Sequence, residues 1–201
     1  MIFRCNPSSL LSVLGGRCFQ LGKLLILLGL IMSPSAWADN NGDKVNKVKA
    51  AFIYNIAKFV RWPDAYQNQD QLQICFYRTD FLGKGFDSIV GRDVHGKSVV
   101  KTTVQDLTQV DACSILLISN FELPHYLNEY ADSPPAIGLL TVADLTASTN
   151  HGENRSGVLL SLIRRGSSIG FEVSLLQVRE RQLQMSSQLL KLANILDKEE
   201  R

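Results

Sequence analysis

Apolar residues recur along this chain with two different periods, and the changes of period mark the predicted elements. From Lys44 to Trp62 the spacing is helical, and Pro63 ends this predicted helix. Its apolar stripe is formed by Val48, Ala51, Phe52, Ile56, Phe59 and Val60. Continuous apolar runs at 113–119 and 137–142 are typical of strands buried on both faces. A shorter run at 71–77 also predicts a strand.

The C-terminal third predicts a hairpin followed by one long helix. Strands at 158–163 and 169–175 are joined at Arg165-Gly166-Ser167, and apolar residues share one side of a helix over 177–196. With short helices at 81–90 and 123–130, the order alternates between helix and strand. The predicted fold class is therefore α/β, a single three-layer domain. Its sheet has about five or six strands, mostly parallel, with helices on both faces and a β-hairpin near the C-terminus.

The N-terminal region has the order of a secretory signal peptide. Arg4, Arg17 and Lys23 precede the apolar run 24–32, and Ala36-Trp37-Ala38 offers a cleavage site. An uncleaved membrane anchor is the alternative, although a span needs about 20 apolar residues. We expect a signal peptide over 1–38, a flexible leader over 39–44, the α/β domain over 45–196 and a polar tail over 197–201.

Removal of the signal peptide changes both the charge and the cysteine count. The whole chain has 21 basic and 19 acidic residues, and cleavage leaves 18 basic and 19 acidic residues, a formal charge of −1. Nucleic acid is therefore excluded as a partner, since its binding requires clustered Lys and Arg. Cys75 and Cys113 remain as a pair in an oxidising compartment, which favours a disulfide bond. The alternative is two unpaired buried thiols.

No residue set in the mature chain matches a catalytic, metal or cofactor motif. Its three histidines, His95, His125 and His151, are far apart and form no zinc motif. Gly83-Lys84-Gly85 lacks the spacing of a phosphate-binding loop, and there is no nucleophile elbow. We therefore predict that the protein is not an enzyme and binds no cofactor.

The candidates for function are surfaces that contact a partner. Arg61 and Trp62 close the first helix, and Glu172 places a carboxylate within an apolar strand, opposite Phe171 and Val173. There are two alternatives for Glu172. It could lie on a solvated outer face, or it could contact Arg164 or Arg165 of the same chain. Leu192 lies away from the main apolar stripe of the last helix, so it is either core or docking surface.

Three segments together resemble the YfiR family of periplasmic proteins. They are Ala51–Pro63, which ends in Arg-Trp-Pro, then Gly170–Leu175, which contains Phe-Glu-Val, and Ser186–Ala193, which reads Ser-Ser-Gln-Leu-Leu-Lys-Leu-Ala. The resemblance covers residues 45–196, and Cys75 and Cys113 fall where that family often has a cysteine pair.

The resemblance implies a compact α/β fold and a regulatory function. The best-understood members of the family bind the periplasmic portion of an inner-membrane diguanylate cyclase and hold it inactive, so that cyclic-di-GMP and biofilm formation stay low. The redox state of their cysteines is linked to this control. Some members have a second cysteine pair before the hairpin, but Thr146–Gly157 contains no cysteine here, so a two-disulfide switch does not carry over.

A small-molecule-binding sensor domain is the alternative function. In a parallel sheet, ligands bind in crevices at the carboxyl ends of the strands. Here such a crevice would involve the loops after Tyr77, Ser119 and Val142. The sequence leaves open whether the protein forms a homodimer.

Overall fold

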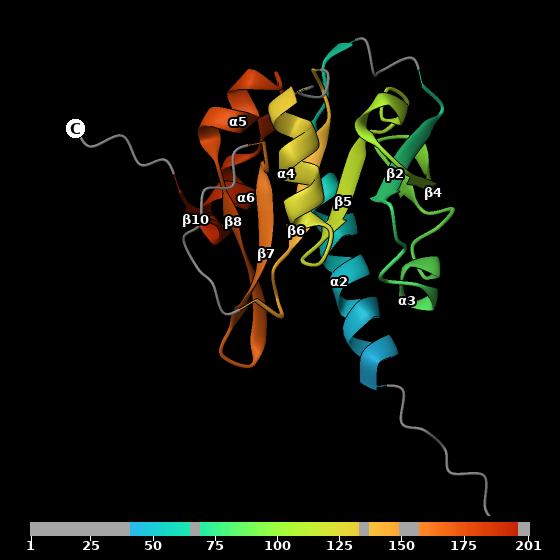
Figure 1. Cartoon of the computed structure of the whole chain (residues 1–201), viewed down its shortest axis with the longest axis vertical. Helices are drawn as coiled ribbons and strands as arrows, with labels where there is room; N and C mark the ends of the chain where they lie inside the picture. Colours follow the sequence, from blue (N-terminus) through green and yellow to red (C-terminus); the bar gives the residue numbers. More distant parts are fainter. Residues whose placement is uncertain (1–40, 65–68, 133–136, 149–156, 197–201) are drawn as a thin grey trace, which may run out of the picture. The chain divides into compact units, whose positions relative to one another are not determined.

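Helices and strands alternate through most of the chain. The computed structural model describes residues 41–64, 69–132, 137–148 and 157–196 (Figure 1). The helices are α2 (Asn41–Ala57), α3 (Lys84–Asp87), α4 (Leu123–Asp132), α5 (Leu175–Glu180) and α6 (Ser187–Leu192), with the 3-10 helix η2 (Leu107–Gln109). The strands are β1 (Val60–Arg61), β2 (Gln71–Tyr77), β3 (Asp93–Val94), β4 (Lys97–Val104), β5 (Ile115–Ser119), β6 (Leu140–Asp144), β7 (Leu160–Arg165), β8 (Ser168–Val173), β9 (Gln184–Met185) and β10 (Asn194–Ile195). The expected signal peptide and polar tail lie outside the described residues, as do residues 149–156 of the loop before the hairpin.

Eight of these strands form one sheet, in the order β10-β8-β7-β6-β5-β2-β4-β3. Figure 1 shows this order from β10 on the left to β4 on the right. Neighbouring strands are parallel, except in the β7–β8 hairpin and the β3–β4 pair. The predicted α/β class, the mostly parallel sheet and the hairpin are confirmed, but the predicted five or six strands are too few. Both edge strands, β3 and β10, have two residues, which is too short for a periodic signal.

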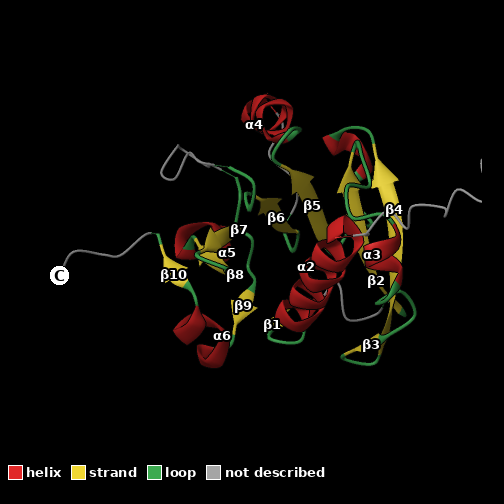
Figure 2. Ribbon diagram, turned by 90° about the horizontal axis from the view of Figure 1, so that it is seen from below, coloured by secondary structure: helices red, strands yellow, loops and turns green. Residues whose placement is uncertain are grey.

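Each face of the sheet carries its own hydrophobic cluster, because successive side chains of a strand point to opposite faces. The cluster on the face that we call the α2 face includes Ile74, Phe76, Ile115 and Leu117, together with buried residues of α2 and α3. The cluster on the opposite face, the α4 face, is formed by other residues of the same strands, together with Tyr126 of α4. Its strand residues include Cys75, Tyr77, Leu116 and Ile118. Figure 2 shows α4 on one side of the strands and α2 and α3 on the other. The predicted helices on both faces are therefore present.

The buried stripe of the first helical segment overlaps the predicted one only in part, since Ile56 and Val60 are buried as predicted. The buried residues of α2 are Ala50, Ile53, Ile56 and Ala57, and the helix spans Asn41–Ala57 rather than Lys44–Trp62. By contrast, Val48 is 54% exposed, and Phe59, which follows the helix, is 38% exposed. This segment therefore has two apolar stripes, and only one of them faces the core.

The predicted C-terminal helix over 177–196 is wrong, because two helices and two short strands occupy this segment. Gln182, just after α5, has a φ of 55°, which a helix interior does not allow. Ser186 then caps α6, since its hydroxyl accepts a hydrogen bond from Leu189 N at 3.2 Å. The apolar spacing continues across these breaks, so it predicted one helix.

Helix α3 packs closely on α2 at Gly85. A Cβ atom at this position would lie 2.5 Å from Asn46 Cβ and 2.8 Å from the backbone nitrogen of Lys47. Glycine is therefore required at position 85 for the contact between the helices. This packing role accounts for Gly85 in the Gly83-Lys84-Gly85 segment, and no phosphate ligand is needed to explain it.

Candidate functional site

The candidate site lies where the end of the first helical segment meets the C-terminal part of the chain. Strands β1 and β9 pair in antiparallel orientation, with Val60 opposite Met185 and Arg61 opposite Gln184. A further backbone hydrogen bond runs from Ser186 N to Phe59 O at 2.9 Å. We call the depression beside this pair the β1–β9 cleft.

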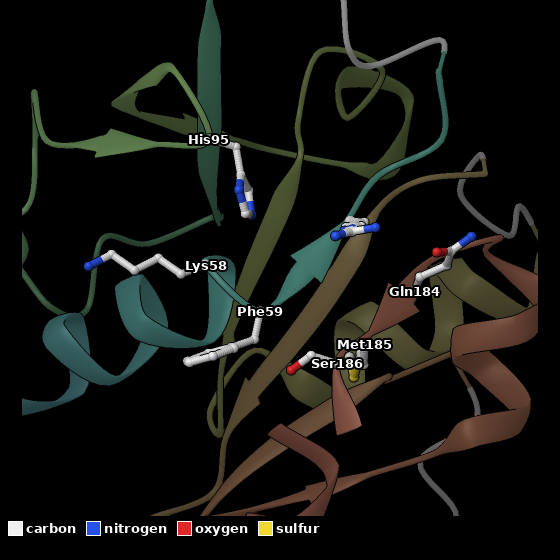
Figure 3. A pocket seen from close by; sticks show the side chains of 7 residues that line it. Lys58, Phe59, His95, Gln184, Met185 and Ser186 are labelled. Atoms are coloured by element: carbon white, nitrogen blue, oxygen red, sulfur yellow. The ribbon is translucent and has the colours of Figure 1, made fainter. Parts of the chain in front are cut away.

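The β1–β9 cleft has a volume of about 400 Å³ and is lined by three segments of the chain. These are the end of the first helical segment with β1, the β3–β4 turn, and β9 with the residue after it. The lining residues are Lys58, Phe59, Arg61, His95, Gln184, Met185 and Ser186. Figure 3 shows His95 pointing from its turn into the space above Phe59, with Gln184, Met185 and Ser186 on the other side.

The lining of the cleft is basic and partly apolar. It includes Lys58, Arg61 and His95 but no carboxylate, while Phe59 and Met185 provide apolar surface. Lys58 Nζ lies 4.1 Å from the centre of the Tyr54 ring, which fixes its ammonium group by a cation–π contact beside the cleft. A basic cleft with apolar residues complements a carboxylate or phosphate next to an apolar group.

Two of the residues expected to bind a partner are adjacent here, but they have different roles. Arg61 is exposed and lines the cleft. Trp62 is half-buried and packs against the α2-face cluster, and its indole nitrogen donates a hydrogen bond to Ser114 O at 3.1 Å. Trp62 therefore attaches β1 to the start of β5 and holds Arg61 in place.

Glu172 lies in the interior rather than on a solvated face. It is 8% exposed and accepts a hydrogen bond from Asn194 Nδ2 at 3.1 Å. These two residues are also opposite each other in the β8–β10 pair. Phe171 and Val173 belong to the α2-face cluster, as the predicted alternation requires. Glu172 therefore secures β10, the strand that follows α6.

The fourth expected partner residue, Leu192, is the last residue of α6 and is 70% exposed. It does not line the β1–β9 cleft. However, the segment 184–195 connects all these features, since β9 pairs with β1 at Arg61 and β10 pairs with β8 at Glu172. The three sequence segments that resemble the YfiR family thus meet in one part of the fold.

Cys75 and Cys113 form a disulfide bond, with a Cα–Cα distance of 5.8 Å. The alternative of two unpaired thiols is therefore wrong for this structure. Both cysteines are fully buried in the α4-face cluster, and the bond links β2 to the turn before β5. Because attack on a disulfide requires access to sulfur, the folded domain shields this bond from reductants.

Sequence reasoning found Arg61 but missed most of the cleft. The predicted first helix contains Lys58 and Phe59, and His95 matched no motif in the sequence. Gln184, Met185 and Ser186 were placed inside one long helix. The only available signal was the resemblance of the first and third segments to the YfiR family, because these segments contain or adjoin the missed residues. That resemblance does not reveal that β1 pairs with β9.

Metal sites and membrane spans are two further features to consider. Among the described residues, no group of three or more His, Cys, Asp or Glu side chains is arranged to hold a metal ion. The helices within the described ranges are all too short or too polar to span a bilayer.

The fold and the cleft together define a disulfide-linked α/β domain with a basic cleft on its surface. A family model described as YfiR/HmsC-like matches residues 46–194, most of the chain and nearly all of the described α/β domain. The chain therefore belongs to the YfiR/HmsC-like family, as its three sequence segments indicated. A comparison with curated proteins finds no significant match.

Proposed function

We propose that this protein is a periplasmic regulator that binds the periplasmic part of an inner-membrane diguanylate cyclase and represses it, which lowers cyclic-di-GMP signalling. The observation that carries this proposal is the match to the YfiR/HmsC-like family over residues 46–194. This range contains all three segments that meet at and around the β1–β9 cleft.

The proposed location follows from two features of the chain. Residues 1–38 have the order of a cleavable signal peptide, which directs the protein out of the cytoplasm. The Cys75–Cys113 disulfide agrees with this location, because such bonds persist in oxidising compartments such as the periplasm.

The proposed partner surface is the β1–β9 cleft together with exposed Leu192. Lys58 and Arg61 would attract an acidic segment of the partner, and Phe59 would contact an apolar side chain beside it. Repression requires that the protein binds the inactive state of the cyclase more tightly than the active state. A preference of about 1.4 kcal/mol shifts that equilibrium about tenfold.

The first experiment tests the function without reference to the surface. Deletion of the gene should raise cellular cyclic-di-GMP, and the wild-type protein should capture a cyclase from solubilised inner membranes. If the deletion leaves cyclic-di-GMP unchanged, the proposed function is wrong.

The second experiment tests the surface with a matched pair of double variants. Lys58→Glu with Arg61→Glu should weaken capture of the cyclase about tenfold or more, because both charges of the cleft are reversed. Lys47→Glu with Lys84→Glu makes the same charge change at exposed positions outside the cleft and should bind like the wild type. Equal binding by the two double variants would remove the cleft from the partner surface and leave the function itself intact.

A further inference from the structure

A second concave surface lies at the opposite end of α2 from the β1–β9 cleft. This groove has a volume of about 460 Å³ and lies between the first turns of α2 and the β7–β8 hairpin. We call it the α2–hairpin groove. Its apolar lining comes from Val45, Val48, Phe52 and Ile169.

Two of the four apolar lining residues are exposed, and the other two, Phe52 and Ile169, are partly buried against the α2-face cluster. Val45 is 44% exposed and Val48 is 54% exposed, on a helix whose core-facing stripe is already complete. Burial of apolar surface stabilises by about 25 cal/mol per Å², so an apolar ligand that covers this stripe would gain affinity.

The walls of the groove are fixed in place before any ligand binds. The Phe52 ring packs edge-on against Phe171, with 5.8 Å between the ring centres. Lys49 Nζ lies 2.7 Å from the Asp144 carboxylate, with both side chains largely buried, and this ion pair ties α2 to the end of β6. A preformed site of this kind loses little conformational entropy when it binds a ligand.

The charged lining of the groove, as far as the described residues go, is positive. Within the described ranges, Lys44 and Arg164 line it, and no acidic residue does. Arg164 Nε donates a hydrogen bond to Thr146 O at 3.3 Å, which orients its guanidinium group at the wall. The nearby Asp144 carboxylate already accepts hydrogen bonds from Lys49 and from Thr146.

We propose that the α2–hairpin groove binds a small amphiphilic carboxylate. Its apolar body would lie on Val48, Phe52 and Ile169, and its carboxylate would meet Lys44 and Arg164. The size of the groove favours a small molecule over a protein, because ligand sites have volumes of about 300–1,000 Å³. A stable protein interface needs about 800 Å² from each partner, far more than these four apolar residues present.

The proposed site does not depend on the cyclase partner. It agrees in part with the ligand crevice that the sequence predicts at the carboxyl ends of the strands. Of the three loops expected to form a ligand crevice, the one after Val142 contributes Thr146 to the groove. The loops after Tyr77 and Ser119 do not line it.

The test compares three probes that share one apolar body. Protein expressed from the full chain is titrated with 4-phenylbutyrate, neutral 4-phenylbutanol and cationic 4-phenylbutylamine, and binding is followed by NMR chemical shifts. We expect 4-phenylbutyrate to bind with a dissociation constant of about 0.1–1 mM and the neutral alcohol about tenfold more weakly. The shifts should be confined to residues around Val48 and Ile169.

Two variants and a control assign the binding to the groove. Val48→Asp and Arg164→Glu should each weaken binding of 4-phenylbutyrate at least tenfold, whereas Lys47→Glu on the same helix should leave it unchanged. Both changed positions are exposed, so the variants should fold, and their unchanged melting temperatures in the absence of ligand would establish this. Three results would each overturn the proposal: equal affinity for all three probes, shifts centred on the β1–β9 cleft, or no binding at about 5 mM, which is about five times the upper end of the expected range.

Discussion

The two faces of the sheet are stabilised in different ways, although the same strands supply both. On the α2 face, aromatic side chains pack edge-to-face, and Phe76 lies 5.6 Å from Phe81 and 5.0 Å from Phe86 between ring centres. On the α4 face, the core contains the Cys75–Cys113 disulfide and buried hydroxyl groups with specific hydrogen-bond partners.

The hydrogen bonds of the α4 face converge on one backbone carbonyl. Gly157 O accepts hydrogen bonds from Tyr126 Oη and from Thr141 Oγ1, both at 2.7 Å. Thr141 Oγ1 in turn accepts a hydrogen bond from Leu159 N at 3.0 Å. A Cβ atom at position 157 would lie 2.5 Å from the Tyr130 ring, so glycine is required there. The α4 face also has an edge-to-face aromatic pair, since the Tyr77 and Tyr126 ring centres are 5.9 Å apart. The α2 face therefore depends mainly on volume and shape, whereas the α4 face adds individual bonds to its packing.

The largest effect is expected for a cavity in the α2 face. Phe76→Ala should lower the free energy of unfolding by about 3–5 kcal/mol, because Phe76 is fully buried and its neighbours cannot fill the space. Phe76→Leu retains much of the volume and should lose only about 1–2 kcal/mol. Urea denaturation measures both values. A loss for Phe76→Ala of no more than that of Phe76→Leu would show that this face does not depend on volume.

A smaller loss is expected when the covalent link of the α4 face is removed. The double variant Cys75→Ala with Cys113→Ala should be less stable by about 3 kcal/mol, since the sequence separation of 38 residues gives an upper estimate of about 3.9 kcal/mol. Thermal unfolding with and without reductant is the measurement. The wild type is unfolded and refolded in reductant, because the folded domain shields the bond. Its stability should then fall to that of the variant, and the same treatment should leave the variant unchanged. A variant as stable as the oxidised wild type would contradict the structural role of the bond.

The hydroxyl of Thr141 should matter more than its methyl group. Thr141→Val keeps the shape but leaves the buried Leu159 N–H without this acceptor, so we expect a loss of about 2 kcal/mol. Thr141→Ser retains the oxygen and should lose about 1 kcal/mol or less. If valine were tolerated better than serine in urea denaturation, the contrast between the two faces would fail.

The smallest effect is a loss of stability at high pH, to which the α4 face contributes through two buried tyrosines. Burial raises the pKa of Tyr77 and of Tyr126, and the Glu129 carboxylate adds to the shift at Tyr77. The unfolded chain releases these phenol protons near pH 10, while the native state keeps them, so stability is complete below about pH 10 and falls above it. Urea midpoints at pH 8, 10 and 11 should show this fall. Tyr126→Phe should make it shallower, and an identical slope in this variant would rule out Tyr126 as a source.

The sequence predicted the central strands well because each is buried on both faces. The continuous apolar run around Ile115–Ser119 predicted a buried strand. The hairpin at Gly166 was predicted from the turn residues between two strands. The edges could not be predicted in the same way. Strands β9 and β10 have two residues each and exist through pairing with β1 and β8, which local periodicity does not report.

The candidate surfaces could not be predicted from the sequence, because the first helical segment has two apolar stripes and either could face the core. Val48, Phe52 and Phe59 were expected to face the core. The structure exposes Val48 at the α2–hairpin groove and Phe59 at the β1–β9 cleft, while Phe52 lines the groove and also packs against the α2-face cluster. An apolar residue at helical spacing fits either a core or a binding surface, and only the packed sheet distinguishes the two. Arg61 and the cysteine pair were found because their chemistry is unusual in its local context.

The C-terminal segment 184–195 has a consequence for the order in which the protein can form. This segment completes the pairing of β1, near the start of the domain, and of β8. Such contacts between distant parts of a chain slow folding, because the ends of a long loop must meet first. A chain delivered from its N-terminus therefore cannot close the domain until segment 184–195 has arrived. Products cut short before Gln184 would lack both strands and remain open to proteolysis, so this segment decides whether the domain is protected.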